Sequence, residues 1–174
     1  MSAGFDPGEI LARYPHPSSA ILPLLHAVQE RDGYCSPDGI AEVARLVGRS
    51  AAEVFGVCSF YTMFKREPFG RLVVSVCTSV SCLRGGPELF EHLEHRYADD
   101  AEILVEEVEC LAACDRVPVM QVNYEYHQGP SHEEAERLVE AYRSGELAAR
   151  GPSGQRAGGL AQDLSPASAG TAAP

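Results

Sequence analysis

Lysine is nearly absent from this sequence of 174 residues, which contains one Lys beside thirteen scattered Arg. Nucleic-acid binding needs clustered positive charge, whereas 25 Asp and Glu here leave a formal net charge of −11. Nucleic acid is therefore excluded as an expected partner. Residues 88–146 hold sixteen Asp and Glu against four Arg, a local charge of −12. This segment is either a solvated acidic face or an electrostatic influence on a nearby site.

Long apolar runs are also missing. The apolar segment at residues 21–28 is interrupted by Pro23 and His26, whereas a membrane-spanning helix needs roughly 18 or more apolar residues. The first residues lack the basic and apolar parts of a secretory signal peptide. We expect a soluble, cytoplasmic protein with no direct membrane insertion, which associates with a membrane only through a partner.

Cysteine is too dilute for a disulfide-stabilised secreted domain, because six Cys are spread over 174 residues. We expect a reduced, intracellular protein whose thiols are available as ligands or reagents. The sequence contains no C-x-x-C pair, which argues against dithiol exchange. It also lacks the G-x-G-x-x-G and P-loop motifs, so it shows no nucleotide site.

The composition divides the chain into four regions. They are an N-terminal extension at 1–17, a helical bundle at 18–66, an α/β domain at 67–146 and a disordered tail at 147–174. In the bundle, an apolar period predicts a helix that ends at Gly33. Ser36 begins a second helix, and Ser50 with Glu53 forms a capping box before a third. The tail has too few large apolar residues to offset the entropy of ordering.

In the α/β domain the hydrophobic period changes to one that is typical of strands. Strands are expected at residues 71–76 and 101–109 and, as one or two strands around a turn near Asn123, at 117–127. Helices are expected at residues 86–97 and from a cap at Ser131 to Gly145. This order predicts a mixed sheet with helices packed on it.

Four of the six Cys form two pairs in equivalent places. Cys77 and Cys82 follow the first expected strand, and Cys110 and Cys114 follow the second. If these two strands run parallel, both loops emerge at the same end of the sheet, where α/β ligand sites usually lie. The sequence therefore predicts that four thiols converge on one point.

Four converging thiolates are compatible with more than one kind of site. A [2Fe–2S] cluster takes two thiolates on each iron and suits widely spaced pairs. Structural zinc is compatible with the C-x3-C pair, while C-x4-C is just wider than its usual knuckle. Redox disulfides or plain buried thiols are the third possibility.

The other Cys, Cys35 and Cys58, have no paired neighbour and are expected in the core or a loop. His92 and His95 are expected on a solvated helix face.

Four segments, in the same order, resemble those of a known family: LPLLHAVQERDGYCSPDGIAEVARLVG, AAEVFGVCSFYTMF, VCTSVSCLRGG and VECLAACDRVPVMQVNYEYH. Over roughly residues 18–143 the chain is similar to the thioredoxin-like [2Fe–2S] ferredoxins that form the E-type subunits of NADH–quinone oxidoreductase, respiratory complex I. Related subunits occur in NAD-linked hydrogenases and formate dehydrogenases. The resemblance implies a helical bundle before a thioredoxin-like [2Fe–2S] domain at 67–146, and one cluster held by Cys77, Cys82, Cys110 and Cys114.

The resemblance also implies an electron-transfer subunit of an oxidoreductase and translocase, with no catalytic site of its own. The expected partner is a larger flavoprotein subunit, which binds FMN and NADH and on which the helical bundle docks, within a complex at the inner face of the cell membrane. The isolated chain is compatible with a homodimer. The alternatives are a diaphorase-type subunit of a hydrogenase or formate dehydrogenase, and a zinc-binding scaffold.

Two departures from the family concern the environment of the site rather than its ligands. Ala112 stands where the family commonly has Gly, and the interval between Cys82 and Cys110 is short for the family. The expected donors to the sulfur atoms are backbone N–H groups of residues 78–81, 83–86 and 111–113. Gly85 and Gly86 form either a tight turn or an ordinary helix start.

Charged side chains near the cysteine pairs are expected to influence the reduction potential of a cluster. Arg84 and Arg116 each lie two residues beyond a cysteine, where they either offset its charge or are ordinary surface residues. Carboxylates disfavour the addition of an electron to an anionic centre. We therefore predict a low potential from four acidic residues near the second pair, Glu106, Glu107, Glu109 and Asp115.

Overall fold

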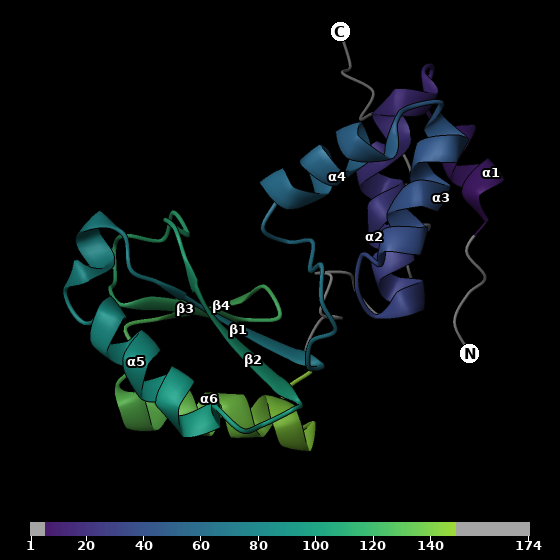
Figure 1. Ribbon diagram of the computed structural model, residues 1–174. Helices are drawn as coiled ribbons and strands as arrows, with labels where there is room; N and C mark the ends of the chain where they lie inside the picture. Colours follow the sequence, from purple (N-terminus) through teal and green to yellow (C-terminus); the bar gives the residue numbers. More distant parts are fainter. Residues whose placement is uncertain (1–5, 149–174) are drawn as a thin grey trace, which may run out of the picture.

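The computed structural model describes residues 6–148. Its elements in chain order are α1 Pro7–Leu11, η1 Pro17–Ala20, α2 Ile21–Asp32, α3 Pro37–Val47, α4 Ala51–Phe60, β1 Leu72–Cys77, η2 Val80–Leu83, α5 Gly86–Tyr97, β2 Ile103–Val108, β3 Val119–Val122, β4 Glu125–Gln128 and α6 His132–Ser144. Figure 1 shows α1 to α4 as one group beside the sheet, with α5 and α6 together on one face of the sheet. The predicted mixed α/β class is confirmed.

The sequence predicts where α2 ends and where α3 and α4 begin, because local signals set these boundaries. Ser36 caps α3, and Ser50 and Glu53 form a reciprocal capping box at the start of α4. Gly33 follows the last residue of α2. The apolar faces of these helices meet in one core, in which Leu24, Leu25, Val28, Val43, Val54 and Cys58 are fully buried.

The described part of the expected N-terminal extension contributes to the same core. Asp6 caps the short helix α1 by accepting a hydrogen bond from the backbone nitrogen of Gly8 at 2.8 Å. Ile10, Leu11 and Tyr14 pack, partly buried, against the helical core. A helix of five residues is too short to show an apolar period, so the sequence pattern did not indicate it.

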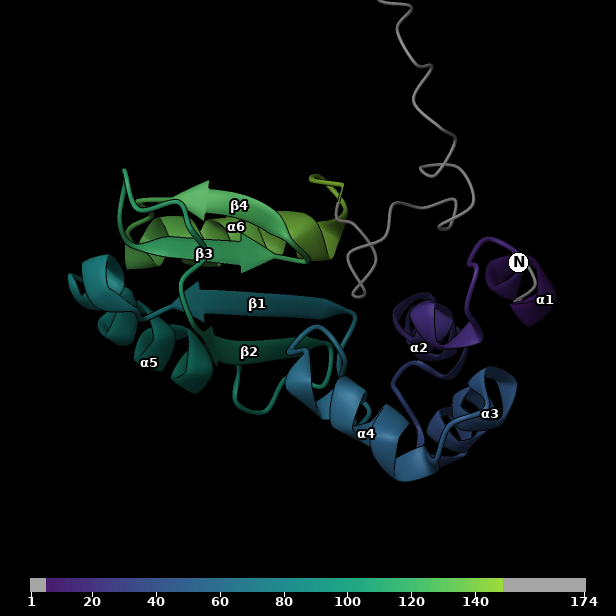
Figure 2. The ribbon, with the colours of Figure 1, turned by 90° about the horizontal axis from the view of Figure 1, so that it is seen from above.

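The sheet has the strand order β2-β1-β3-β4. Strand β1 pairs in parallel with β2, from Leu72 opposite Ile103 to Cys77 opposite Val108, and antiparallel with β3, which pairs antiparallel with β4. Figure 2 shows this order from above. The crossover through α5 explains the parallel pair, since parallel neighbours need a long connection.

A tight turn at Asn123 and Tyr124 divides the segment expected at 117–127 into β3 and β4. Both residues have positive φ angles, 46° and 68°. The side chain of Asn123 is buried and accepts a hydrogen bond from the backbone nitrogen of Val73 at 2.7 Å, and its amide donates to the carbonyl oxygen of Arg71 at 3.0 Å. The turn is thereby fixed to the start of β1.

The core of the helical half is separate from a second large core in the α/β half. The second one lies between the sheet and the helices α5 and α6, and it contains Leu72, Val74, Val76, Leu89, Leu93, Met120, Val122 and Val139. An ion pair between Lys65 and Glu106, with an N···O distance of 2.5 Å, joins the segment after α4 to β2. The division at residues 66 and 67 into a helical bundle and an α/β domain stays a prediction.

Two expectations concern membranes and the tail. Between residues 6 and 148, no helix is both long enough and apolar enough to cross a membrane. The tail expected at 147–174 lies, from residue 149 onward, outside the described residues.

Candidate functional site

The two cysteine pairs emerge from the same edge of the sheet. Cys77 is the last residue of β1 and lies opposite Val108, the last residue of the parallel strand β2. A further hydrogen bond, from the backbone nitrogen of Thr78 to the carbonyl oxygen of Val108 at 3.3 Å, continues the ladder beyond the strands. Cys110 follows two residues later. The parallel pairing expected from the sequence is therefore present.

The first pair is buried. Cys77 and Cys82 are 2% and 1% exposed, and they pack with Val119 in a small apolar cluster of their own. Between them, η2 turns the chain so that Cys82 returns beneath the surface, while Val80 and Leu83 remain exposed. The sequence placed both cysteines in this loop but did not indicate their burial.

Gly85 and Gly86 are needed for this arrangement. Gly85 has a φ of 100°, a conformation that side-chain-bearing residues rarely adopt. A β-carbon at Gly86 would meet the carbonyl oxygen of Cys77 at 2.3 Å and the β-carbon of Cys82 at 3.3 Å. The glycine pair is thus both the start of α5 and a close backbone approach to the first cysteine pair.

The second pair is exposed. The Sγ atoms of Cys110 and Cys114 are 3.7 Å apart, and the backbone nitrogen of Ala112 donates to the Cys110 sulfur at 3.3 Å. Ala112 has a φ of 59°, in the left-handed region. Ala112 therefore fits at this position under backbone strain, which glycine would not have.

Electrostatic interactions connect the two pairs. Burial, together with the neighbouring thiols of Cys77 and Cys114, raises the pKa of the Cys82 thiol to about 11, although a hydrogen bond from the backbone of Val119 acts in the opposite direction. The neighbouring Cys110 thiol raises the pKa of Cys114, with a smaller contribution from Cys77. Each pair therefore lies within electrostatic reach of the other.

The donor set fits a [2Fe–2S] cluster. Two thiolates bound tetrahedrally at about 2.3 Å to one metal lie about 3.8 Å apart, which agrees with the 3.7 Å between Cys110 and Cys114. Within residues 6–148, no three His, Cys, Asp or Glu side chains are grouped around one point, so the convergence of all four thiols stays a prediction. The thiols are instead arranged as two pairs, and a [2Fe–2S] cluster takes two thiolates on each of two irons.

The charged residues near the site are in part compensated. Glu106, one of the four carboxylates expected to lower a potential, pairs with Lys65 and also accepts a hydrogen bond from Ser75 at 2.8 Å. Glu107 accepts one from the hydroxyl group of Thr78 at 2.6 Å.

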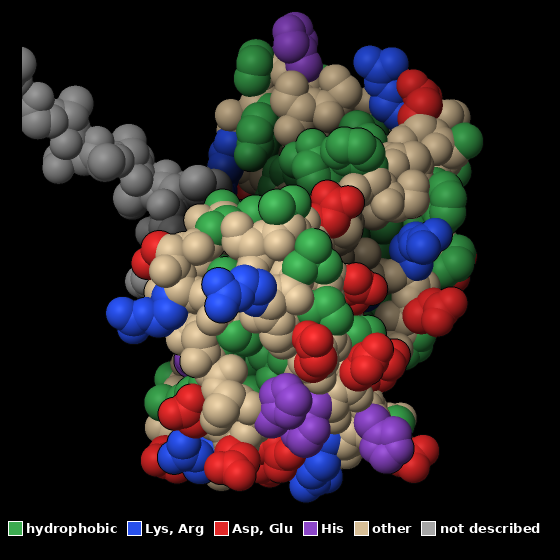
Figure 3. All heavy atoms as spheres, turned by 90° about the vertical axis from the view of Figure 1, so that its left-hand side faces the viewer, with side chains coloured by type: hydrophobic (Ala, Val, Ile, Leu, Met, Phe, Trp, Pro, Cys, Tyr) green, Lys and Arg blue, Asp and Glu red, His purple; other side chains and the backbone are tan. Residues whose placement is uncertain are grey.

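Arg84 and Arg116 are exposed. Figure 3 shows the end of the molecule that carries η2, where Asp, Glu and His gather in the lower part, the region of α5 and α6.

The sequence placed Cys35 and Cys58 in the core or in a loop, and in the structure both lie in the helical core. Their two thiols are neighbours there. Both are buried. The pKa of Cys35 is raised by a hydrogen bond with the Cys58 thiol and by burial. Chain folding thus brings together two cysteines that are far apart in the sequence, one from the loop before α3 and one from α4.

The two histidines expected on a solvated face differ from each other. His95 is exposed. His92 is half-buried between α5 and α6, where its Nε2 lies 2.6 Å from Glu136 and its ring stacks on His132 at 4.5 Å between centroids. His92 is thus less exposed than the sequence predicted, because α6 packs beside it.

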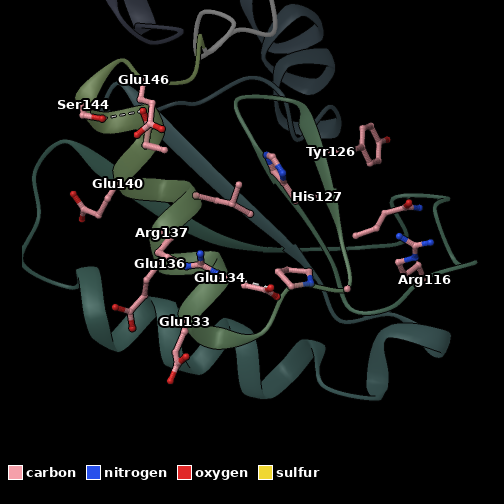
Figure 4. A pocket seen from close by; sticks show the side chains of 15 residues that line it. Arg116, Tyr126, His127, Glu133, Glu134, Glu136, Arg137, Glu140, Ser144 and Glu146 are labelled. Atoms are coloured by element: carbon pink, nitrogen blue, oxygen red, sulfur yellow. Dashed lines mark hydrogen bonds and ion pairs between the residues drawn. The ribbon is translucent and has the colours of Figure 1, made fainter.

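A groove of about 1380 Å³ runs between β4 and α6 (Figure 4), and none of the four paired cysteines lines it. Its charged lining residues are mostly acidic: Glu133, Glu134, Glu136, Glu140 and Glu146, against Arg116 and Arg137. Arg116, Tyr126 and Gln128, which lie near the loop of the second cysteine pair, also line the groove, whereas the four thiols do not.

Sequence reasoning missed three contributors to the thiol site. The backbone N–H of Val119 interacts with the Cys82 sulfur, and the side chains of Tyr126 and Gln128 bind the loop of the second pair. Of the expected donors, the N–H of Ala112 does reach a sulfur. The alternation of β4 places Tyr126 and Gln128 on one face, which was the one available signal.

Comparisons with known proteins identify the family. Residues 8–143 match the model of the thioredoxin-like [2Fe–2S] ferredoxins, and the chain belongs to this family. The E-type subunit of the NADH-quinone oxidoreductase of Mycobacterium tuberculosis is 41% identical over 147 residues, which cover 80% of this chain and 58% of that relative. NADH-quinone oxidoreductase subunit 2 of Thermus thermophilus is 38% identical over 148 residues, covering 79% and 82%. The chain thus spans little more than half the length of the mycobacterial relative.

A solved structure supports the fold. An NAD⁺-reducing [NiFe]-hydrogenase in the air-oxidized state aligns with a TM-score of 0.58 at 20% sequence identity, over 71% of this chain and 23% of that one. At this identity the likeness concerns the fold alone. The resemblance expected from the sequence, to the E-type subunits of NADH–quinone oxidoreductase, is confirmed by the relatives.

Proposed function

We propose that this chain is the electron-transfer subunit of an NADH dehydrogenase of the NADH–quinone oxidoreductase type. The observation that carries the proposal is the arrangement of Cys77, Cys82, Cys110 and Cys114 as two pairs at one edge of the sheet. These four residues would hold one [2Fe–2S] cluster. When bound, such a cluster accepts and donates single electrons.

The chain's own residues make the two sides of the site different. Cys77 and Cys82 are covered by protein, which excludes water from their thiolates, whereas Cys110 and Cys114 lie at the surface. Burial and hydrogen bonds to sulfur both influence the potential of such a centre. An electron therefore has its shortest route to a partner through the exposed loop.

The partner is a flavoprotein subunit that carries FMN and NADH, and this chain contributes no catalytic site of its own. Exposed apolar side chains support a docked state, because isolated soluble chains expose few of them together. Phe55 and Phe60 on α4 are 46% and 77% exposed, and Val80 and Leu83 beside the cysteines are 83% and 63% exposed. The helical bundle and η2 would then face the partner, within a complex at the inner face of the cell membrane.

A second candidate is the equivalent diaphorase-type subunit of an NAD-linked hydrogenase or formate dehydrogenase. The sequence resembles these subunits too, and the fold shared with an NAD⁺-reducing [NiFe]-hydrogenase is compatible with either candidate. Affinity purification of the full chain from its native host separates the two candidates by the catalytic subunits that accompany it.

The test is anaerobic purification followed by absorption spectroscopy and by iron and acid-labile sulfide analysis. We expect about two iron and two sulfide per chain. Serine variants of each of the four paired cysteines should lose most of this content. Cys58→Ala serves as the matched control, because Cys58 lies in the helical core. A colourless protein with one zinc and no sulfide would overturn the proposal and favour the zinc-binding scaffold.

A further inference from the structure

The loop that carries Cys110 and Cys114 lies between the end of β2 and the start of β3 and contains no helix or strand. Both of its thiols are exposed. Packing therefore fixes this loop less than it fixes the buried pair, Cys77 and Cys82. The positions of its peptide groups depend on hydrogen bonds from neighbouring elements.

Tyr126 on β4 supplies one of these hydrogen bonds. Its hydroxyl group donates to the carbonyl oxygen of Leu111 at 3.1 Å. The C=O and N–H of a trans peptide group point in opposite directions, and the N–H of the same group belongs to Ala112. That N–H donates to the Sγ of Cys110, with an N···S distance of 3.3 Å. One peptide group thus connects the Tyr126 hydroxyl to the Cys110 sulfur.

Gln128 holds the other half of the loop. Its Nε2 donates to a carboxylate oxygen of Asp115 at 2.8 Å and to the carbonyl oxygen of Ala113 at 3.3 Å. Tyr126 and Gln128 share one face of β4, since they are two residues apart in a strand. Figure 4 shows that Tyr126 points away from α6, whereas His127 points between β4 and α6.

Strand β4 is a fixed platform for these contacts. All four of its residues pair with β3, from Gln128 opposite Val119 to Glu125 opposite Val122. The turn between the two strands is bound to β1 through Asn123. The Tyr126 hydroxyl is therefore held in place by the sheet and not by the loop that it contacts.

We propose that Tyr126 is a positioning residue of the cluster site, which turns the peptide group between Leu111 and Ala112 so that its N–H is directed at the Cys110 sulfur. The inference rests on the proposed function. A hydrogen bond to a ligand sulfur stabilises the more negative, reduced state of the site. The Tyr126 hydroxyl therefore raises the reduction potential without touching the cluster.

The test compares the full chain with its Y126F variant, which loses only the hydroxyl group. Both are titrated anaerobically against redox dyes, and the reduced form is followed by electron paramagnetic resonance. We expect a lower midpoint potential for Y126F, so that the ratio of reduced to oxidised protein at a fixed potential falls several-fold. We also expect altered g values and an unchanged melting temperature of the apo-protein, which a merely structural role would not produce.

The matched control is Y61F, which removes the hydroxyl group of another partly exposed tyrosine, in the helical half of the chain. Its potential and g values should equal those of the wild type. Equal potentials and spectra in all three proteins would overturn the positioning role while leaving the proposed function intact. A wild-type protein without iron and sulfide would instead overturn the proposed function itself.

Discussion

Gly86 lies directly against Cys77: a β-carbon at Gly86 would be 2.3 Å from the Cys77 carbonyl oxygen. This oxygen belongs to the backbone at the end of a buried strand, so it can move aside only if the strand moves with it. The start of α5 and the first cysteine pair are therefore in direct contact, and a larger side chain at Gly86 would displace the cysteines.

We expect Gly86→Ala to lower the free energy of unfolding by about 1–3 kcal/mol, the usual cost of overpacking. The iron content per chain should also fall, because the loop of Cys77 and Cys82 must shift. Urea unfolding and iron analysis measure the two effects. Gly56→Ala is the matched control, since a β-carbon at Gly56, on α4, meets nothing within 4 Å. There the change should be neutral or stabilising by up to about 1 kcal/mol; similar losses in both variants would contradict this account.

Ala112→Gly should relieve the backbone strain in the second cysteine loop. The φ of Ala112 is 59°, a conformation that costs a residue with a side chain about 1–2 kcal/mol relative to glycine. The loop of Cys110 and Cys114 should then hold its metal longer. The expected result is a several-fold slower loss of iron to a chelator. Ala113→Gly, where φ is not positive, should speed the loss or leave it unchanged; the same slowing there would argue against strain as the cause.

Removal of a carboxylate near the site should raise the reduction potential. Glu107 accepts a hydrogen bond from Thr78, the residue after Cys77, and Glu109 directly precedes Cys110. For Glu107→Gln or Glu109→Gln we expect a rise on the order of 10–40 mV, because one negative charge no longer opposes the added electron. A redox titration measures this. Glu91→Gln, on the exposed side of α5, should change the midpoint less; an unchanged or lowered potential in both test variants would count against the electrostatic explanation.

The stability of the helical core should depend on pH through His26. Its ring packs against Phe64, and its buried Nδ1 atom has no hydrogen-bond partner among residues 6–148. Burial lowers the pKa of His26 below its ordinary value of 6.5. The unfolded chain therefore binds a proton that the folded chain does not, so stability is lost as the pH falls below about 6.5.

We expect His26→Leu to flatten the pH dependence of urea unfolding between pH 7 and 5 and to preserve stability at neutral pH. The control is His95→Gln, at an exposed position on α5, which should keep the wild-type slope. His127 contributes a slope of the same sign, because burial also lowers its pKa. A full wild-type slope in His26→Leu would show that His26 is not responsible.

The elements that the sequence predicted are those fixed by neighbouring residues. The capping boxes at Ser50 and Ser131 involve residues three positions apart, and the period of the apolar residues is equally local. The edge shared by the cysteine pairs was also predictable, because a strand, a helix and a second strand in succession imply parallel pairing.

The remainder depends on contacts between distant residues. Tyr126 reaches Leu111 across 15 positions, and Lys65 reaches Glu106 across 41. Neither contact has a periodic signature, since each arises from how separate elements pack. The burial of one cysteine pair and the exposure of the other also depend on such distant contacts, because they follow from how η2 and α5 fold over Cys77 and Cys82.

The scarcity of lysine has a practical consequence. Lys65 is the one lysine of the chain, and its side chain, 12% exposed, is paired with Glu106. Apart from the N-terminal amine, an amine-selective reagent thus has a single target, at the junction between the helical segment and the sheet. Slow acylation of Lys65 would report a closed junction and rapid acylation an open one, so the protein carries its own single-site chemical probe.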